Sequence, residues 1–184
     1  MSDAPLKLLF AGPTGAGKTT AIAAISDFPP VSTDVAATDE VAAMKSGTTV
    51  AMDYGEITLA QGQKVFLYGT PGQARFDFMW KILATNSLGL IILLDNSSRD
   101  PLGDLETYVD HFRDLIDRAA GVVGVTRAEQ GPLLGAYFAL LQRKGCLMPV
   151  LEVDARKKQD VLCLLDAFLS ILEHAELPDE RRVS

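Results

Sequence analysis

The stretch Gly12-Pro13-Thr14-Gly15-Ala16-Gly17-Lys18-Thr19 matches the pattern Gly-x-x-x-x-Gly-Lys-Ser/Thr at every fixed position. The apolar segment 6–11 before it predicts a buried strand, and the Ala-rich segment 20–25 after it predicts a helix. A glycine loop in this position turns its backbone N–H groups toward an anion, and the helix N-terminus adds partial positive charge. The stretch therefore predicts a phosphate-binding loop that holds a nucleotide.

Individual residues of this loop have distinct expected roles. Lys18 would reach the outer phosphates and take part in catalysis, and the Thr19 hydroxyl would ligate Mg²⁺. The other residues expected to contact the nucleotide here are Gly12, Thr14, Gly15, Ala16, Gly17 and Thr20. The alternative is a glycine-rich turn that matches the pattern by chance, and the order of strand, loop and helix favours the nucleotide site.

Length and charge limit the classes of protein to consider. The chain has 184 residues, of which 48% are hydrophobic and 22% charged, as is ordinary for a soluble α/β domain. A net charge of −7 argues against a nucleic-acid-binding protein and against attachment to an anionic membrane surface. We expect one domain over residues 1–177 and a polar tail over 178–184.

Targeting and cysteine patterns point to the cytoplasm. The sequence has no run of 18 apolar residues and no signal-peptide pattern, and neither Ser2 nor the final residues 181–184 carry a lipidation signal. We therefore expect a cytoplasmic protein with no intrinsic membrane anchor. Cys146 and Cys163 lie in apolar surroundings without metal-ligand spacing, which predicts a reduced, buried pair.

Strand and helix patterns alternate along the chain. The alternation predicts an α/β fold with a mostly parallel six-stranded sheet, one antiparallel edge strand and helices on both faces. Segment 31–47 is expected to be a long functional loop. Strands are expected over 6–11, 49–59, 64–68, 88–94, 122–125 and 148–153, and helices over 20–25, 76–84, 101–120, 132–144 and 161–173.

The order of motifs resembles the Ras-like small GTPases over nearly the whole chain. Within that superfamily it looks closest to the prokaryotic MglA-type GTPases and their Arf-like relatives. The shared residues are 12–20, Thr49 before a strand, Pro71-Gly72-Gln73, and Asp95-Asn96-Ser97-Ser98-Arg99. The resemblance implies a Ras-like G domain of the P-loop NTPase fold that binds GTP or GDP with Mg²⁺ and hydrolyses GTP.

By this resemblance, Thr49 is the threonine of the first switch segment. It stands 31 residues after Lys18, and it would ligate Mg²⁺ and meet the γ-phosphate. Thr48 is a competing candidate, and both residues also suit a plain strand. Asp53 reads as a polar group on the face of that strand.

The second switch segment begins at Gly69, where small GTPases have an aspartate that reaches Mg²⁺ through water. MglA-type proteins also lack this aspartate, so the departure is compatible with that subfamily. Gly72 can bring its N–H close to a γ-phosphate because it has no side chain, and the amide of Gln73 can orient an attacking water. Pro71-Gly72 is also typical of a type II turn.

Base recognition is expected from two loops. Thr126-Arg127-Ala128-Glu129 aligns with the Asn/Thr-Lys-x-Asp motif, in which a carboxylate accepts hydrogen bonds from guanine. Glu129 keeps that carboxylate on a side chain one methylene longer. Residues 154–156 resemble Ser-Ala-Lys, so the Ala155 N–H would read the guanine oxygen. The alternative is a solvated turn with no role in binding.

No arginine finger is evident, since Arg75 can face the wrong way and Lys45 is not a guanidinium. Fast hydrolysis needs such a positive charge, so we expect slow intrinsic turnover that a partner stimulates. The resemblance implies a small Roadblock-type partner. We expect it to bind the aromatic cluster beside the second switch segment, formed by Phe76, Phe78, Met79 and Trp80.

Three hypotheses follow from these motifs. The first is a GTP-hydrolysing molecular switch, and the second is a nucleotide-dependent binding module with little catalysis. The third is a P-loop ATPase or small-molecule kinase, in which Asp95 at the end of an apolar strand would serve as the metal-binding carboxylate. That reading leaves Thr49 and Pro71-Gly72-Gln73 without roles.

Overall fold

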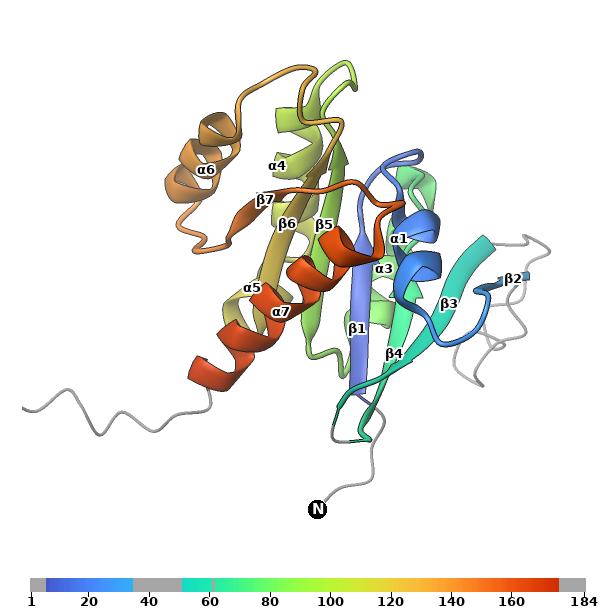
Figure 1. Cartoon of the computed structure of the whole chain (residues 1–184). Helices are drawn as coiled ribbons and strands as arrows, with labels where there is room; N and C mark the ends of the chain where they lie inside the picture. The colour runs from blue at the N-terminus through green and yellow to red at the C-terminus, as the bar shows by residue number, and fades with distance from the viewer. Residues whose placement is uncertain (1–5, 35–50, 61, 176–184) are drawn as a thin grey trace, which may run out of the picture.

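A computed structural model describes residues 6–34, 51–60 and 62–175 (Figure 1). Seven strands form one sheet in the order β2-β3-β4-β1-β5-β6-β7. The strands are β1 (Leu6–Ala11), β2 (Val31–Asp34), β3 (Ala51–Thr58), β4 (Lys64–Gly69), β5 (Gly89–Asp95), β6 (Ala120–Thr126) and β7 (Val150–Glu152). The helices are α1 (Lys18–Ile25), the 3₁₀ turn η1 (Ala74–Phe76), α3 (Asp77–Ala84), α4 (Pro101–His111), α5 (Arg113–Arg118), α6 (Leu134–Arg143) and α7 (Lys158–Ala175).

The sheet is parallel except at one strand. β3 pairs antiparallel with both β2 and β4, and the pairs β4–β1, β1–β5, β5–β6 and β6–β7 are all parallel. This confirms the predicted α/β class and the single antiparallel strand, although that strand, β3, lies inside the edge strand β2 and not at the edge itself. The architecture is that of a P-loop NTPase fold.

Helices cover both faces of the sheet and bury two apolar clusters. Figure 1 shows α1 and α7 in front of the sheet, with α3, α4 and α5 behind it. Alternate residues of β1 divide between the faces, since Leu8 and Phe10 pack with α1 and α7 whereas Leu9 and Ala11 pack with α3, α4 and α6. Buried on both faces, β5 and β6 show the continuous apolar runs that central parallel strands require.

The sheet has one strand more than predicted, because Val31–Asp34 forms β2 at the edge. This segment was expected to belong to a long loop. Its register places Val31 opposite Tyr54 and Asp34 opposite Ala51. A four-residue edge strand of mixed polarity shows neither an alternating nor a continuous apolar pattern, so pairing with β3 determines its structure.

The single helix predicted over 101–120 is also wrong, because the chain forms α4 and α5 with a break at Phe112. Phe112 ends α4 by donating its N–H to Tyr108, and its own carbonyl accepts from Leu115 and Ile116. Leu105, Val109, Phe112 and Leu115 are all buried, so the apolar spacing continues through the break and conceals it.

Several loops converge at the carboxyl end of the parallel strands, where such folds bind ligands. Residues 12–17 follow β1, residues 70–73 follow β4, Asn96 follows β5 and Arg127 follows β6. Within the described ranges, no helix combines the length and the hydropathy needed to cross a membrane. The expected tail 178–184 lies outside these ranges.

Replacing Gly89 with alanine is expected to destabilise the fold by about 3 kcal/mol. A Cβ at Gly89 would lie 2.0 Å from the Ala120 carbonyl oxygen and 2.7 Å from the Phe168 ring, at a backbone φ of +153°. Urea unfolding would measure the decrease in the free energy of unfolding.

The matched control is Gly135→Ala in α6, where a Cβ meets nothing within 4 Å. Its unfolding free energy should stay within about 1 kcal/mol of the parent or rise, because alanine favours a helix. Equal effects at the two positions would contradict the packing described for β5 and β6.

Candidate functional site

Three glycines of the 12–19 loop have backbone conformations that other residues rarely adopt. Their φ angles are +141° at Gly12, +85° at Gly15 and +100° at Gly17. A Cβ on Gly12 would lie 2.0 Å from the Leu93 carbonyl oxygen, and one on Gly17 would lie 2.9 Å from the Ala155 Cβ. The loop therefore packs directly against β5 and against the loop that follows β7.

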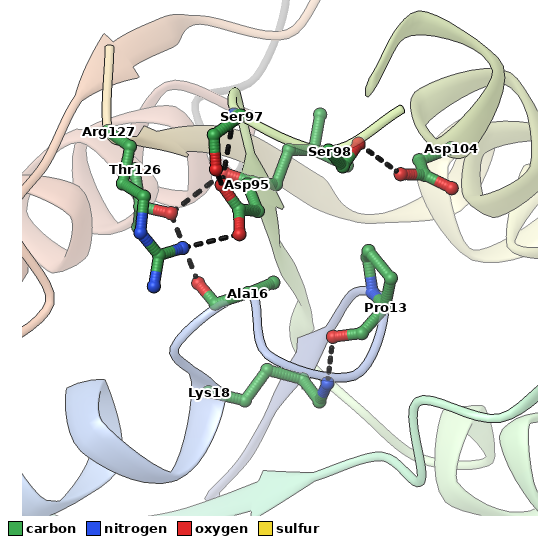
Figure 2. Close-up of polar contacts among 10 residues, drawn as sticks. Pro13, Ala16, Lys18, Asp95, Ser97, Ser98, Asp104, Thr126 and Arg127 are labelled. Carbon is green, nitrogen blue, oxygen red and sulfur yellow. Dashed lines mark hydrogen bonds and ion pairs between the residues drawn. The ribbon is translucent and has the colours of Figure 1, made fainter. Parts of the chain in front are cut away.

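Lys18 is enclosed by the loop that precedes it. Its side chain is buried, and its ammonium donates a hydrogen bond to the Gly12 carbonyl at 2.6 Å. It also donates to the Pro13 carbonyl at 2.8 Å (Figure 2). Burial lowers the pKa of Lys18 to about 8, and the nearby Asp53 carboxylate opposes this shift. A buried cation enclosed by a glycine loop at a helix N-terminus suits the phosphates of a nucleotide.

Thr19 contacts a carboxylate from a neighbouring strand. Its hydroxyl donates to Asp53 Oδ2 at 2.5 Å, and Asp53 lies opposite Gly69 in the pairing of β3 with β4. A Cβ on Gly69 would lie 3.0 Å from both the Cβ and Oδ2 of Asp53. The Asp53 side chain thus occupies the space beside Gly69, a role that the sequence reading of Asp53 as a plain strand-face group missed.

The segment predicted to be the second switch lies against the phosphate loop. A Cβ on Gly72 would come within 2.4 Å of the Thr14 nitrogen, so only glycine permits this approach. Gln73 follows with an exposed side chain just before η1. Thr49, predicted to be the threonine of the first switch segment, and its competitor Thr48 lie outside the described residues.

A pocket of about 870 Å³ joins the phosphate loop to the two loops predicted to read the base. Eight predicted site residues line it: Gly15, Ala16, Gly17, Thr20, Thr126, Arg127, Glu129 and Ala155. Its volume lies within the range usual for small-molecule sites. Gly12, Thr14, Lys18, Thr19, Gly72 and Gln73 are not among its lining residues and belong to the adjoining phosphate region.

Thr126 ends β6 and Arg127 starts the loop after it, and both contact neighbouring elements (Figure 2). The Thr126 hydroxyl donates to the Leu94 carbonyl at 3.1 Å and approaches the Ala16 carbonyl at 3.4 Å. Arg127 has a φ of +53° and forms an ion pair with Asp95. Burial alone would raise the pKa of Asp95, but hydrogen bonds from Ser97 and Arg127 outweigh it and lower this pKa.

Asn96 organises the rest of this loop, although its sequence context gave it no individual role. Its buried side-chain amide donates to the carbonyls of Ala128 and Pro132, both at 3.1 Å, and its oxygen accepts from the Tyr137 hydroxyl. Asparagine can satisfy both kinds of partner at once because it carries donors and an acceptor. No local sequence pattern predicts these hydrogen bonds, since the partners of Asn96 lie 32 to 41 residues away.

The last loop of the site is held by Asp154. Its carboxylate accepts hydrogen bonds from the Arg156 side chain and backbone N–H, which lower the pKa of Asp154, and its own N–H donates to Asp160. Ala155 lies buried between these residues and against Gly17. Ala155 therefore lies beside the phosphate loop.

Two sequence predictions at this end of the molecule are wrong. Cys146 is buried as expected, but Cys163 is exposed and lines the pocket. The aromatic cluster proposed as a partner surface is mostly core, because only Phe78 is exposed, at 44%, whereas Phe76, Met79 and Trp80 are buried. Apolar side chains on a short helix do not reveal from sequence which of them face the sheet.

The described residues offer oxygen ligands that suit Mg²⁺. Nowhere in the described ranges do three His, Cys, Asp or Glu side chains form a metal-binding group. Magnesium, however, is usually held by one or two protein oxygens together with phosphates and water. The Thr19 hydroxyl and the Asp53 carboxylate provide such a pair beside Lys18.

Comparison with known proteins agrees with a nucleotide-binding role. A family described as "Conserved hypothetical ATP binding protein" matches residues 30–111, less than half of the chain. Intraflagellar transport protein 22 of Chlamydomonas reinhardtii is 25% identical over 76% of this chain and 71% of its own length. An uncharacterized protein of Methanocaldococcus jannaschii is 39% identical over 28% of this chain, and the match spans 32% of that protein.

Fold, loop geometry and these similarities converge on one class of protein. The sheet order, the enclosed Lys18 and the pocket beside it all fit a phosphate loop that holds a nucleotide. The chain has the P-loop NTPase fold, and its similarities support a nucleotide-binding protein.

Proposed function

We propose that this chain is a small GTP-binding switch with slow, partner-stimulated hydrolysis, closest in type to the MglA and Arf-like GTPases. The observation that carries the proposal is the continuity of the site. Gly17 joins the phosphate loop to Ala155, and one pocket runs from there to Thr126 and Glu129. This continuity supports a site with the phosphates at the 12–19 loop and the base near Glu129.

Guanine is the proposed base because a carboxylate is available at the base end. Glu129 lines the pocket and would accept hydrogen bonds from the two guanine N–H groups, while the Ala155 N–H would donate to the guanine oxygen. Adenine presents no matching pair of donors to a carboxylate. Asn96 supports this arrangement because its amide fixes the backbone at Ala128, directly before Glu129.

Residues of the phosphate end would hold Mg²⁺ and prepare hydrolysis. Thr19 and Thr49 are the proposed ligands, with Asp53 supplying the carboxylate that Gly69 lacks. When bound, the ion would neutralise charge on the phosphate oxygens. Lys18 would contribute a second positive charge, and Gln73 would orient the attacking water.

An ATP-binding protein is the main alternative, since the matching family carries that description. The matched residues 30–111 contain neither the phosphate loop 12–19 nor the base loop 126–129, so the match does not distinguish the bases. In addition, Asp95, the carboxylate that an ATPase reading requires, is hydrogen-bonded through both oxygens to Ser97 and Arg127. Thr19 contacts Asp53 instead.

A binding module with little catalysis is the second alternative. The Arg75 guanidinium lies 4.7 Å from the centre of the Phe76 ring, which favours a packing role for that arginine. Catalytic positive charge would then come from a partner, and a Roadblock-type protein is the proposed one by family resemblance. Multiple-turnover phosphate release with and without such a partner would distinguish a switch from an inert module.

The proposal is tested by calorimetric titration of the full chain with GTP, GDP, ATP and ADP in the presence of Mg²⁺. We expect tighter binding of both guanine nucleotides than of their adenine counterparts. Equal affinities, or a preference for adenine, would instead support the ATP-binding alternative.

The Glu129→Ala variant should weaken GTP binding about 10- to 100-fold, because a charged hydrogen-bond acceptor is lost, and leave ATP binding unchanged. Gln130→Ala is the matched control, since Gln130 is the next residue and lines the same pocket. A Glu129→Ala protein with the parent preference for GTP would remove Glu129 from base recognition.

Replacing Asp53 with asparagine should raise by about tenfold the Mg²⁺ concentration needed for half-maximal GTP binding, since Mg²⁺ prefers a charged oxygen ligand. GDP binding measured in EDTA should stay within about twofold of the parent. Glu56→Gln, on the same strand and paired with Lys64, is the control for a lost charge.

A double variant, Asp53→Ala with Gly69→Asp, moves the carboxylate from β3 to the paired position on β4. It tests whether the negative charge itself or its strand matters. We expect it to recover part of the Mg²⁺ response because the carboxylate would return from the adjacent strand. Failure of Asp53→Asn to change the Mg²⁺ response would contradict the proposed role.

A further inference from the structure

Trp80 links the second switch segment to the helical layer behind the sheet. Its indole N–H donates to the Pro71 carbonyl at 2.8 Å, and its side chain is only 2% exposed. Trp80 belongs to α3, and residues of α4 pack against its indole ring. The Tyr108 ring stacks on it with centroids 4.7 Å apart, and His111 meets it edge-on at 4.8 Å. A tryptophan packed in this way has little freedom to move its N–H.

This hydrogen bond fixes the direction of the next backbone N–H. A peptide unit is planar, and the chain contains no cis peptide bond among its described residues, so the Pro71 carbonyl and the Gly72 N–H point in opposite directions. With the carbonyl held by Trp80, the Gly72 N–H must face away from the indole. Gly72 itself lies against the Pro13–Thr14 peptide of the phosphate loop.

Such a constraint matters because Gly72 is free to rotate. Glycine populates conformations that other residues avoid, so the Pro71–Gly72 peptide can turn over at little cost unless something holds it. Tyr108 adds a second, weaker contact, its hydroxyl lying 3.4 Å from the Gly72 carbonyl oxygen. Both carbonyls on the helical side are thus engaged by α3 and α4.

We propose that Trp80 is a positioning residue that presents the Gly72 N–H to the terminal phosphate and so sets the preference for triphosphate over diphosphate. This inference rests on the proposed nucleotide-binding function and assigns to Trp80 the sensing of the third phosphate. Binding of the first two phosphates belongs to the 12–19 loop and does not involve Trp80.

The test compares dissociation constants for GDP and a non-hydrolysable GTP analogue with Mg²⁺ in the parent, Trp80→Phe and Tyr108→Phe. Phenylalanine at position 80 keeps an aromatic ring but loses the donor. The analogue-to-GDP preference should fall about tenfold in Trp80→Phe and about twofold in Tyr108→Phe, with GDP affinity within about twofold of the parent.

Phe112→Leu is the control for lost packing, because the Phe112 ring stacks on Trp80 at 5.8 Å without donating a hydrogen bond. It should lower the unfolding temperature and leave the nucleotide preference unchanged. An unchanged preference in folded Trp80→Phe, or an equal loss for both nucleotides, overturns the inference.

A second measurement uses the parent protein alone and does not depend on the folding of a variant. With ¹⁵N-glycine labelling, the Gly72 amide resonance should move on binding the analogue and stay in place on binding GDP. An unmoved resonance overturns the inference. A parent that binds no nucleotide overturns the proposed function as well, whereas a parent that binds GTP without these Trp80 effects overturns only the role of Trp80.

Discussion

The structure depends on glycines between β1 and α1 that bring the backbone into close contact with neighbouring elements. Gly12 meets the Leu93 carbonyl of β5 and Gly17 meets Ala155, at distances that leave no room for a side chain. These contacts seat the phosphate loop between the centre of the sheet and the loop after β7. Glycines of the kind that allow N–H groups to turn toward an anion therefore also let the loop pack against β5 and Ala155.

Side-chain hydrogen bonds and an ion pair shape the part of the pocket that is proposed to hold the base. Asn96 is buried at the end of β5 and satisfies two carbonyls and a tyrosine hydroxyl, while Asp95 beside it pairs with Arg127. Removing a partner from such a buried network leaves other groups unsatisfied, which is costly. The loop that carries Glu129 is thus shaped in part by Asn96, which does not line the pocket.

Sequence reasoning was most reliable where a local pattern has one physical meaning. The 12–19 loop, the buried runs of β5 and β6 and the antiparallel pairing of β3 with β4 follow from glycine placement and apolar spacing, and the structure has them where predicted. The break at Phe112, strand β2 and the exposure of Cys163 depend on which neighbours a residue meets across the fold. Spacing along the chain does not encode these contacts. Trp80 shows the same limit, since its donor partner is set by how α3 packs.

The pairing of Asp53 with Gly69 has a consequence for how related chains are found. A carboxylate reaches Thr19 from β3, while the position across from it on β4 is bare. A sequence motif is defined along one strand. It therefore records that Gly69 is not an acid and overlooks the carboxylate of Asp53 on the neighbouring strand. A search that requires one acidic residue at either of the two paired positions, 53 or 69, would find proteins that a motif on a single strand excludes.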